Sequence, residues 1–240
     1  MTEKLYLDDA FLKEIDATVE SVSNNGITLD RTVFYARGGG QPGDSGSFMA
    51  GSGNIEISDT IKEGVEVIHI PVMVDHHLKK GDHVKCRIDW DRRFAHMRYH
   101  TSIHLIDAVI NMNPDYNGMI TGSQIYENRA RVDFSMEDLS TDLAISILEG
   151  ANEEIGKKRD LIVKYITKEE ALSIPNLART KPGRDLINSI DIIRVVEIVG
   201  LDQQADGGTH VKNLSEIGRI KFSKMENKGK NNKRVYFTVS

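Results

Sequence analysis

The chain has 240 residues, of which 39% are hydrophobic and 28% charged, a composition typical of a globular protein with one large domain or two small ones. Its single cysteine, Cys86, cannot form a disulfide within the chain, which excludes a disulfide-stapled fold and a metal site built mainly from thiolates. No run approaches the roughly 18 apolar residues of a membrane span, and the polar start lacks the apolar core of a signal peptide. We therefore expect a cytoplasmic protein with no membrane association.

The net charge of −5 is unevenly distributed along the chain. Residues 212–234 carry eight basic and two acidic side chains, which gives this segment a charge of +6 against −11 for the remainder. A basic segment on an acidic body is typical of a protein that binds a polyanion, so the acidic total does not argue against nucleic acid.

The chain up to about residue 90 is rich in short β-type runs. Strands are predicted at 18–22 and 26–29 around a turn at 24–26, and then at 55–58, 65–70 and 84–88. This pattern favours a small β-barrel or compact sheet. In its middle, residues 32–46 form a glycine-rich segment that either adopts backbone conformations closed to other residues or is a flexible surface loop.

The apolar periodicity becomes helical from residue 91. It predicts a helix that ends before Asn113-Pro114 and a second helix over about 140–158. Strands at 161–166, 191–198, 216–223 and 235–239, with a short helix at 168–172, are expected to follow. The predicted fold class is α+β, with a β-rich domain over residues 1–90 and an α/β two-layer domain over residues 91–240.

His100 and His104 are four residues apart on the first predicted helix. At this spacing both imidazoles project from one helix face and can bind one metal ion, although surface or core histidines show the same spacing. His96 extends the series, but eight helical residues rise about 12 Å, so His96 and His104 cannot share a tetrahedral ion.

Further metal ligands must come from another part of the chain. Asp206 and His210 flank Gly207-Gly208, a turn that can bring both side chains toward a common point. An ordinary turn followed by a strand is the alternative.

These residues carry a resemblance to a known family. His100-Thr-Ser-Ile-His104 resembles the HxxxH motif of the editing domain of alanyl-tRNA synthetases and of the free-standing AlaX editing proteins. Asp206-Gly-Gly-Thr-His210, followed by Ser215-Glu-Ile-Gly218, resembles their CGGTHV…GEIG signature. Residues 32–46 resemble the TxFYPxGGGQPxDxG loop, and residues 226–230 match a basic ExKGK element. Four motifs in family order cover most of the chain, and its length is similar to that of the medium AlaX form.

The resemblance implies a trans-editing hydrolase that cleaves the ester of mischarged tRNA(Ala). Ser-tRNA(Ala) is the chief expected substrate and Gly-tRNA(Ala) a further one, and no aminoacylation domain is expected. It implies one zinc ion per chain, bound by His100, His104, Asp206 and His210. The implied catalytic residues are His100 and His104, together with Thr32 and Gln41, which would line the amino-acid pocket.

This chain departs from the family at Asp206, where the family usually has cysteine. Aspartate is an acceptable but harder zinc ligand, so zinc affinity should fall. Alternatively, Asp206 lies outside the coordination shell and a water molecule takes the fourth position, and Asp202 is a weaker candidate ligand. The backbone N–H groups of Gly207 and Gly208 are candidate oxyanion donors.

The basic segment is the expected tRNA contact, although a solvated hairpin is the alternative. Its candidate residues are Arg219, Lys221, Lys228, Lys230, Lys233 and Arg234. Tyr35, Arg37 and Tyr99 are candidates for stacking on the single-stranded end of the tRNA. We expect a monomer.

Two other functions fit part of the sequence. An editing domain of the threonyl-tRNA synthetase type shares the histidine motifs, but it usually lacks the glycine-rich loop. A tRNA-binding module without catalysis is suggested by Asp206 in place of cysteine.

Overall fold

The computed structural model describes residues 2–51, 53–73, 75, 77–179 and 181–240. The chain forms two compact units, Met1–His96 and Met97–Ser240. The first is β-rich and the second combines helices with sheets, in general agreement with the predicted class. Helix α1 (Trp90–Met112) begins one residue before the predicted helical periodicity, and the division between the units falls after His96, not after residue 90 as predicted.

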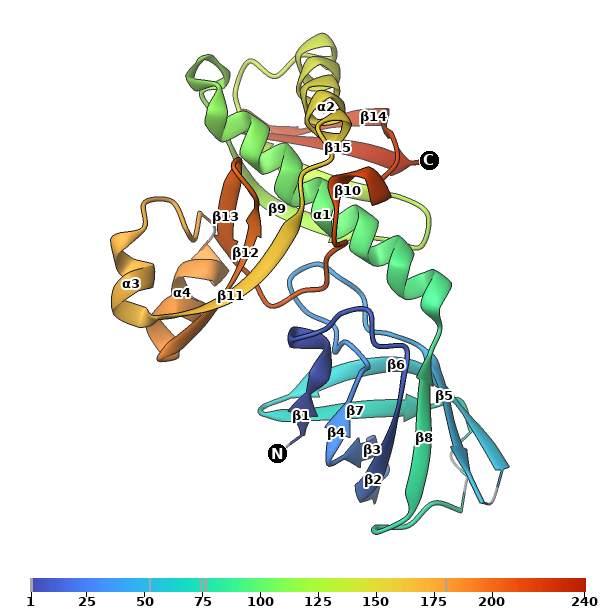
Figure 1. The fold of residues 1–240 in the computed structure, drawn as a ribbon. Helices are drawn as coiled ribbons and strands as arrows, with labels where there is room; N and C mark the ends of the chain where they lie inside the picture. The colour runs from blue at the N-terminus through green and yellow to red at the C-terminus, as the bar shows by residue number, and fades with distance from the viewer. Residues whose placement is uncertain (1, 52, 74, 76, 180) are drawn as a thin grey trace. The chain divides into compact units, whose positions relative to one another are not determined.

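Six strands of the first unit form a closed barrel, in the order β2-β3-β7-β6-β5-β8 (Figure 1). They are β2 (Glu14–Ser23), β3 (Gly26–Leu29), β5 (Gly46–Ala50), β6 (Gly53–Glu63), β7 (Glu66–Pro71) and β8 (His83–Ile88). In strand β8 every second residue is buried, namely Val84, Cys86 and Ile88. One face of the strand therefore packs in the core inside the barrel. Of the two predicted alternatives, a small barrel or a compact sheet, the structure has the barrel. Burial raises the pKa of the Cys86 thiol, which packs in this core as a protonated group.

Short elements accompany the barrel. Strands β1 (Glu3–Lys4) and β4 (Arg31–Thr32) pair in parallel, and the turn η1 (Leu5–Leu7) follows β1. The sequence did not predict β1, β4 or β5, because two to five residues are too few to show a period.

An antiparallel four-stranded sheet and two long helices form much of the second unit. The strands are ordered β14-β15-β10-β9 and comprise β9 (Met119–Ile125), β10 (Ala130–Ser135), β14 (Ile220–Gly229) and β15 (Asn232–Val239). Helix α1 contacts this sheet through Tyr99, whose ring lies 6.0 Å from that of Phe237. Helix α2 (Thr141–Gly156) begins after Ser140, whose hydroxyl accepts a hydrogen bond from Leu143 N–H. Both long helices confirm the prediction.

The strand that directly precedes Asp206 belongs to a separate three-stranded sheet. Its antiparallel strands are β11 (Leu161–Thr167), β12 (Ile192–Ile198) and β13 (Asp202–Ala205), in that order. Helices α3 (Lys168–Ser173) and α4 (Lys181–Ser189) pack against this sheet. The small core between them includes Ala171, Ile187 and Val195. Helix α3 confirms the predicted short helix.

The strand predicted at 216–223 was wrong at its start. Asn213 caps the 3-10 turn η3 (Leu214–Glu216), and β14 begins only at Ile220. The basic residues 226–234 lie in a β-hairpin, in which β14 continues to Gly229 and β15 begins at Asn232. Another 3-10 turn, η2 (Pro114–Tyr116), lies between α1 and β9. Among the described residues, no helix combines the length and apolar character that crossing a membrane would require.

Candidate metal centre

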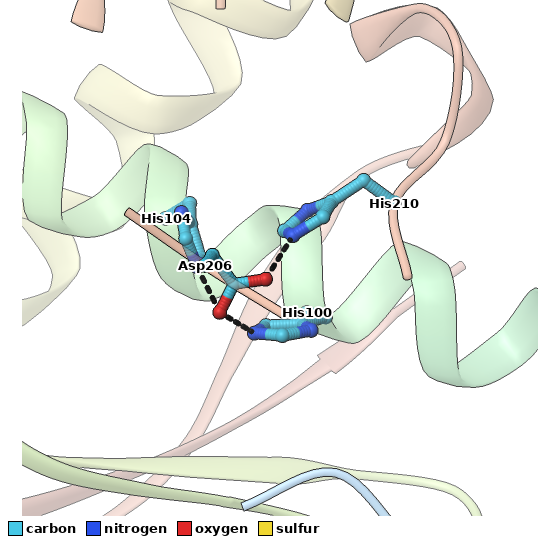
Figure 2. A group of neighbouring side chains, drawn as sticks. All are labelled: His100, His104, Asp206 and His210. Carbon is cyan, nitrogen blue, oxygen red and sulfur yellow. Dashed lines mark hydrogen bonds and ion pairs between the residues drawn. The ribbon is translucent and has the colours of Figure 1, made fainter. Parts of the chain in front are cut away.

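Three histidines and one aspartate of the second unit converge on one point (Figure 2). His100 and His104 project from the same face of α1, with ring centroids 5.0 Å apart. The ring of His210, from the segment after β13, lies 4.5 Å from that of His100 and 4.7 Å from that of His104. Asp206 points into the space between the three rings. The structure therefore brings together the four residues expected to bind the metal.

The spacing of the four groups matches a tetrahedral site. Oδ1 of Asp206 lies 3.7 Å from Nε2 of His100 and 3.8 Å from Nε2 of His104, and Oδ2 lies 3.0 Å from Nε2 of His210. One ligand atom from each residue lies within 4.8 Å of the others. Bonds of about 2.0–2.1 Å to a tetrahedral zinc ion place neighbouring ligand atoms about 3.3–3.4 Å apart, so small side-chain shifts complete the site. The residues fit zinc.

The protonation states of the cluster also suit a metal. Burial lowers the pKa of His104 to about 4, and it lowers the pKa values of His100 and His210. Burial alone would raise the pKa of Asp206, but the facing imidazoles, His100 above all, hold it well below its usual range. At neutral pH the cluster thus offers three neutral imidazoles and one carboxylate, the forms that bind metal ions.

The Gly207-Gly208 turn gives Asp206 its orientation. Gly208 N–H donates to Oδ2 of Asp206 at 2.5 Å, so this expected oxyanion donor is engaged within the cluster. On the other side, Arg194 of β12 donates from Nη1 to the backbone oxygen of Asp206 at 2.8 Å. The backbone on both sides of the carboxylate is therefore fixed.

Thr101 supports His210 from helix α1. Its hydroxyl oxygen lies 3.2 Å from Nδ1 of His210 and accepts a hydrogen bond from Val211 N–H at 3.2 Å. When Nε2 of His210 binds a metal, Nδ1 carries the ring proton and can donate it to this hydroxyl. Thr101 is the second residue of the HxxxH motif, and no sequence pattern indicated this role.

A buried ion-pair network joins α1 to β13 beside the cluster. Arg179 pairs with Asp107, one helical turn beyond His104, at 2.6 Å, and with Asp202. Gln204 donates to the same Asp202 carboxylate at 2.8 Å. Asp202 is thus engaged by Arg179 and Gln204 and lies outside the group of four, which argues against its role as a substitute ligand.

In the first unit, the glycine-rich segment is an ordered structure, so the flexible-loop alternative was wrong. Asp44 and Tyr35 are buried, and Tyr35 N–H donates to Oδ2 of Asp44 at 2.7 Å. The fully buried guanidinium of Arg93 pairs with the same carboxylate and donates to the backbone oxygen of Val33. A charge-assisted network therefore fixes the segment at both ends.

Two family models match this chain, one over the region of the glycine-rich segment and one over the region of Asp206 and His210. A family model described as "Threonyl and Alanyl tRNA synthetase second additional domain" matches residues 193–236, and one described as "tRNA synthetases class II (A)" matches residues 6–92. The alanyl-tRNA editing protein AlaX-M of Saccharolobus solfataricus is 41% identical over all of this chain and 99% of its own length. The AlaX-M protein of Methanosarcina barkeri is 40% identical, with the same coverage. The chain belongs to the AlaX-M family of alanyl-tRNA editing proteins.

The longer relatives share the same stretch. The AlaX-L protein of Pyrococcus horikoshii is 33% identical over 99% of this chain, which spans 58% of that protein. The alanine–tRNA ligase of Thermococcus kodakarensis is 32% identical over 99% of this chain and 26% of its own length. The AlaX-M chain therefore corresponds to a section of these larger proteins.

Thr32 and Gln41, the expected pocket residues, are buried in the first unit of this AlaX-M chain. Nδ1 of His69 lies 3.0 Å from the Ile27 oxygen and so carries the ring proton. Nε2 of His69 consequently accepts the hydroxyl proton of Thr32 at 2.8 Å, and the same hydroxyl accepts from Phe34 N–H at 3.0 Å. The Thr32 hydroxyl can thus only accept one further hydrogen bond.

The six expected tRNA-binding cations lie on the β14–β15 hairpin and its approach, and several have acidic partners. Lys228 pairs with Glu226 at 2.9 Å, and Lys230 pairs with Glu137 at 3.2 Å. Arg219 pairs with Glu149 at 2.7 Å, Lys233 donates to Asn227 at 3.0 Å, and Lys221 is exposed.

Arg234 stands apart from the other hairpin cations. It donates to both carboxylate oxygens of Asp133 on β10, at 2.7 and 2.9 Å. This bidentate pair holds two neighbouring strands together, so Arg234 has a structural role in the sheet.

Two of the three expected stacking residues are inaccessible. Tyr35 and Tyr99 are only 5% and 3% exposed, so neither ring can stack on a nucleotide in this structure. Arg37 is more exposed but pairs with Asp59 at 2.6 Å.

Proposed function

We propose that this AlaX-M protein hydrolyses the ester of Ser-tRNA(Ala) in the cytoplasm and releases serine and intact tRNA(Ala). The observation that carries this proposal is the His100, His104, Asp206 and His210 cluster, whose spacing and protonation suit a tetrahedral metal. Gly-tRNA(Ala) is a second proposed substrate. The need for such editing is physical, because a site that selects alanine discriminates weakly against one added hydroxyl or one missing methyl group.

Zinc is the proposed metal, one ion per chain. A zinc ion held by these residues would act as a Lewis acid on an ester carbonyl, an amino group or a water molecule that it binds as a further ligand. The three imidazoles remain neutral and leave the ion a net positive charge, which the Asp206 carboxylate reduces in part.

Thr32 and Gln41 are proposed to select the seryl group. The one remaining lone pair of the Thr32 hydroxyl can accept the seryl hydroxyl proton, because the Thr32 proton is already donated to His69. Alanine would leave this acceptor unpaired in a buried site, a loss of about 1–3 kcal/mol. His69 would thereby set the direction of the hydrogen bond by which serine is recognised.

The hairpin cations are proposed to contact tRNA phosphates. Lys221, Lys228, Lys230 and Lys233 are the best placed of the six, because Arg234 and Arg219 each have two contacts to one carboxylate. Binding of phosphates to these lysines would release counter-ions and make affinity depend on salt. A monomer suffices for this arrangement, since all four proposed metal ligands come from one chain.

The test is deacylation of purified Ser-tRNA(Ala), Gly-tRNA(Ala) and Ser-tRNA(Thr) by the zinc-loaded protein. We expect hydrolysis of the first, with His104→Ala inactive and lacking zinc. Preferential hydrolysis of Ser-tRNA(Thr) would support the threonyl type of editing instead. Tight tRNA binding without hydrolysis of any substrate would support a binding module and contradict the proposal.

A further inference from the structure

Three residues stand in one row across the three-stranded sheet. Tyr165 of β11 is the register partner of Arg194 of β12. Asp206 directly follows Ala205, the β13 partner of Val195, and its N–H donates to the Arg194 oxygen at 3.2 Å. Side chains of directly paired residues lie on the same face of a sheet, so Tyr165, Arg194 and Asp206 share one face.

The metal centre lies on this face. The Arg194 guanidinium donates to the backbone oxygen of Asp206, and its Nη1 lies 4.0 Å from Oδ2 of that carboxylate. Arg194 is therefore the middle residue of the row, with Tyr165 on one side and Asp206 of the metal centre on the other. Two strand spacings separate Tyr165 from Asp206, about 10 Å between their Cα atoms.

Tyr165 is accessible where the expected stacking residues are not. It is 49% exposed, the largest exposed fraction among the tyrosine, phenylalanine and tryptophan side chains that the structure describes. Val163, two residues earlier on the same face of β11, is 40% exposed and extends the apolar surface. About half of this aromatic side chain is therefore exposed to solvent, on the sheet face that carries the metal centre.

We propose that Tyr165 stacks on the base of the 3′-terminal adenosine of the substrate tRNA. This inference rests on the proposed function. The scissile ester is attached to the ribose of that nucleotide, so with the ester at the Asp206 cluster the base must lie about one ribose away. The Cα atoms of Tyr165 and Asp206 are about 10 Å apart, which leaves room for one ribose between the ring and the cluster. Stacking on an aromatic ring is the common way in which proteins hold unpaired bases.

The experiment measures binding of a catalytically inert RNA minihelix ending in CCA, with and without its terminal base. Tyr165→Ala should weaken binding of the intact end by roughly 5- to 150-fold, the range measured for base–aromatic stacking. It should change binding of the abasic end by less than twofold. Tyr165→Phe should bind both ends as the unchanged protein does, because it keeps the ring.

Ile162→Ala is the matched control. Ile162 is 46% exposed on the same strand but on the opposite face, so its loss should affect neither minihelix. Equal weakening of both ends by Tyr165→Ala, or no weakening of either, would overturn the proposal. Either result would also arise if Tyr165 served a protein partner or the fold alone.

The outcome is independent of the hydrolysis assay. Base-dependent weakening in a protein that hydrolyses no aminoacyl-tRNA would keep the Tyr165 contact and reject the hydrolase. Hydrolysis of Ser-tRNA(Ala) with no base-dependent weakening would keep the hydrolase and reject the Tyr165 contact.

Discussion

A side chain on Gly208 would collide with the ring of His100. A Cβ built at this glycine lies well inside van der Waals contact with Cε1 and Nδ1 of His100, and 3.0 Å from Oδ2 of Asp206. No atom lies within 4 Å of the corresponding position on Gly207. Glycine is therefore required at position 208, where the backbone passes directly beside His100, a proposed ligand.

Gly208→Ala should displace His100 and reduce zinc binding by at least tenfold, because the added methyl group occupies the space of the imidazole. Gly207→Ala is the matched control and should bind zinc as the unchanged protein does. Zinc affinity can be measured by competition with a chromogenic chelator. Equal affinities for the two variants would show that His100 is not held against this turn in the metal-bound protein.

Asp206→Cys should bind zinc more tightly than the unchanged protein, since a thiolate is a softer ligand and a better match for zinc. Asp206→Ala should bind it more weakly, because the cluster then lacks its only carboxylate. The same chelator competition gives both values. If neither substitution changes the affinity, Asp206 lies outside the coordination shell and a water molecule takes the fourth position.

His69 should make the protein less stable in weak acid. Burial lowers the pKa of His69 to about 4, so between pH 6.5 and 4 the unfolded chain binds a proton that the folded chain does not. His69 therefore does not reduce the free energy of unfolding above pH 6.5, but lowers it by roughly 3 kcal/mol as the pH falls from 6.5 to 4. His69→Gln lacks the titrating group, and its free energy of unfolding should change less over this range.

Urea unfolding of both proteins at pH 7.5 and pH 4 measures this difference. At pH 7.5 His69→Gln should be the less stable protein, by about 1–3 kcal/mol, because one amide does not reproduce both imidazole hydrogen bonds, to the Ile27 oxygen and to the Thr32 hydroxyl. Identical pH dependence in the two proteins would mean that the pKa of His69 is the same in the folded and the unfolded chain.

Replacing Lys228, Lys230 and Lys233 with alanine should weaken tRNA binding and flatten its dependence on salt. The slope of log affinity against log salt should fall by roughly 2–3, close to one unit for each lost phosphate contact. Glu226→Gln gives the opposite test, because Glu226 pairs with Lys224 and Lys228 and its neutralisation frees both cations. Affinity should then rise. Unchanged slopes in both variants would exclude this hairpin as the tRNA contact.

Local patterns were sufficient to predict the long helices and the four residues that converge in the proposed metal site. The apolar spacing before Asn113 and the cap at Ser140 mark α1 and α2, and His100 and His104 share one helix face by their spacing alone. Asp206 and His210 were found because a glycine turn separates them by four residues. In each case the signal lies within a few turns of backbone.

Features that depend on remote partners could not be predicted. Asp133 interrupts the apolar pattern of β10, and besides its neighbour Arg131 it pairs with Arg234, which lies 101 residues later in the chain. Helix α4 begins with Lys-Pro-Gly, which reads as a loop, and it is stabilised by packing against the three-stranded sheet. The pair of Asp44 with Arg93 spans 49 residues, and it fixes a glycine-rich segment whose composition alone suggested flexibility.

The most direct measurement is the initial rate of deacylation of Ser-tRNA(Ala) and of Ala-tRNA(Ala) by the zinc-loaded and the metal-stripped protein. Hydrolysis of the seryl ester at least tenfold faster than the alanyl ester, lost on metal removal and restored by zinc, is the predicted result. Equal rates for the two esters, or seryl hydrolysis that persists after the metal is removed, would contradict a metal-dependent editing site in this chain.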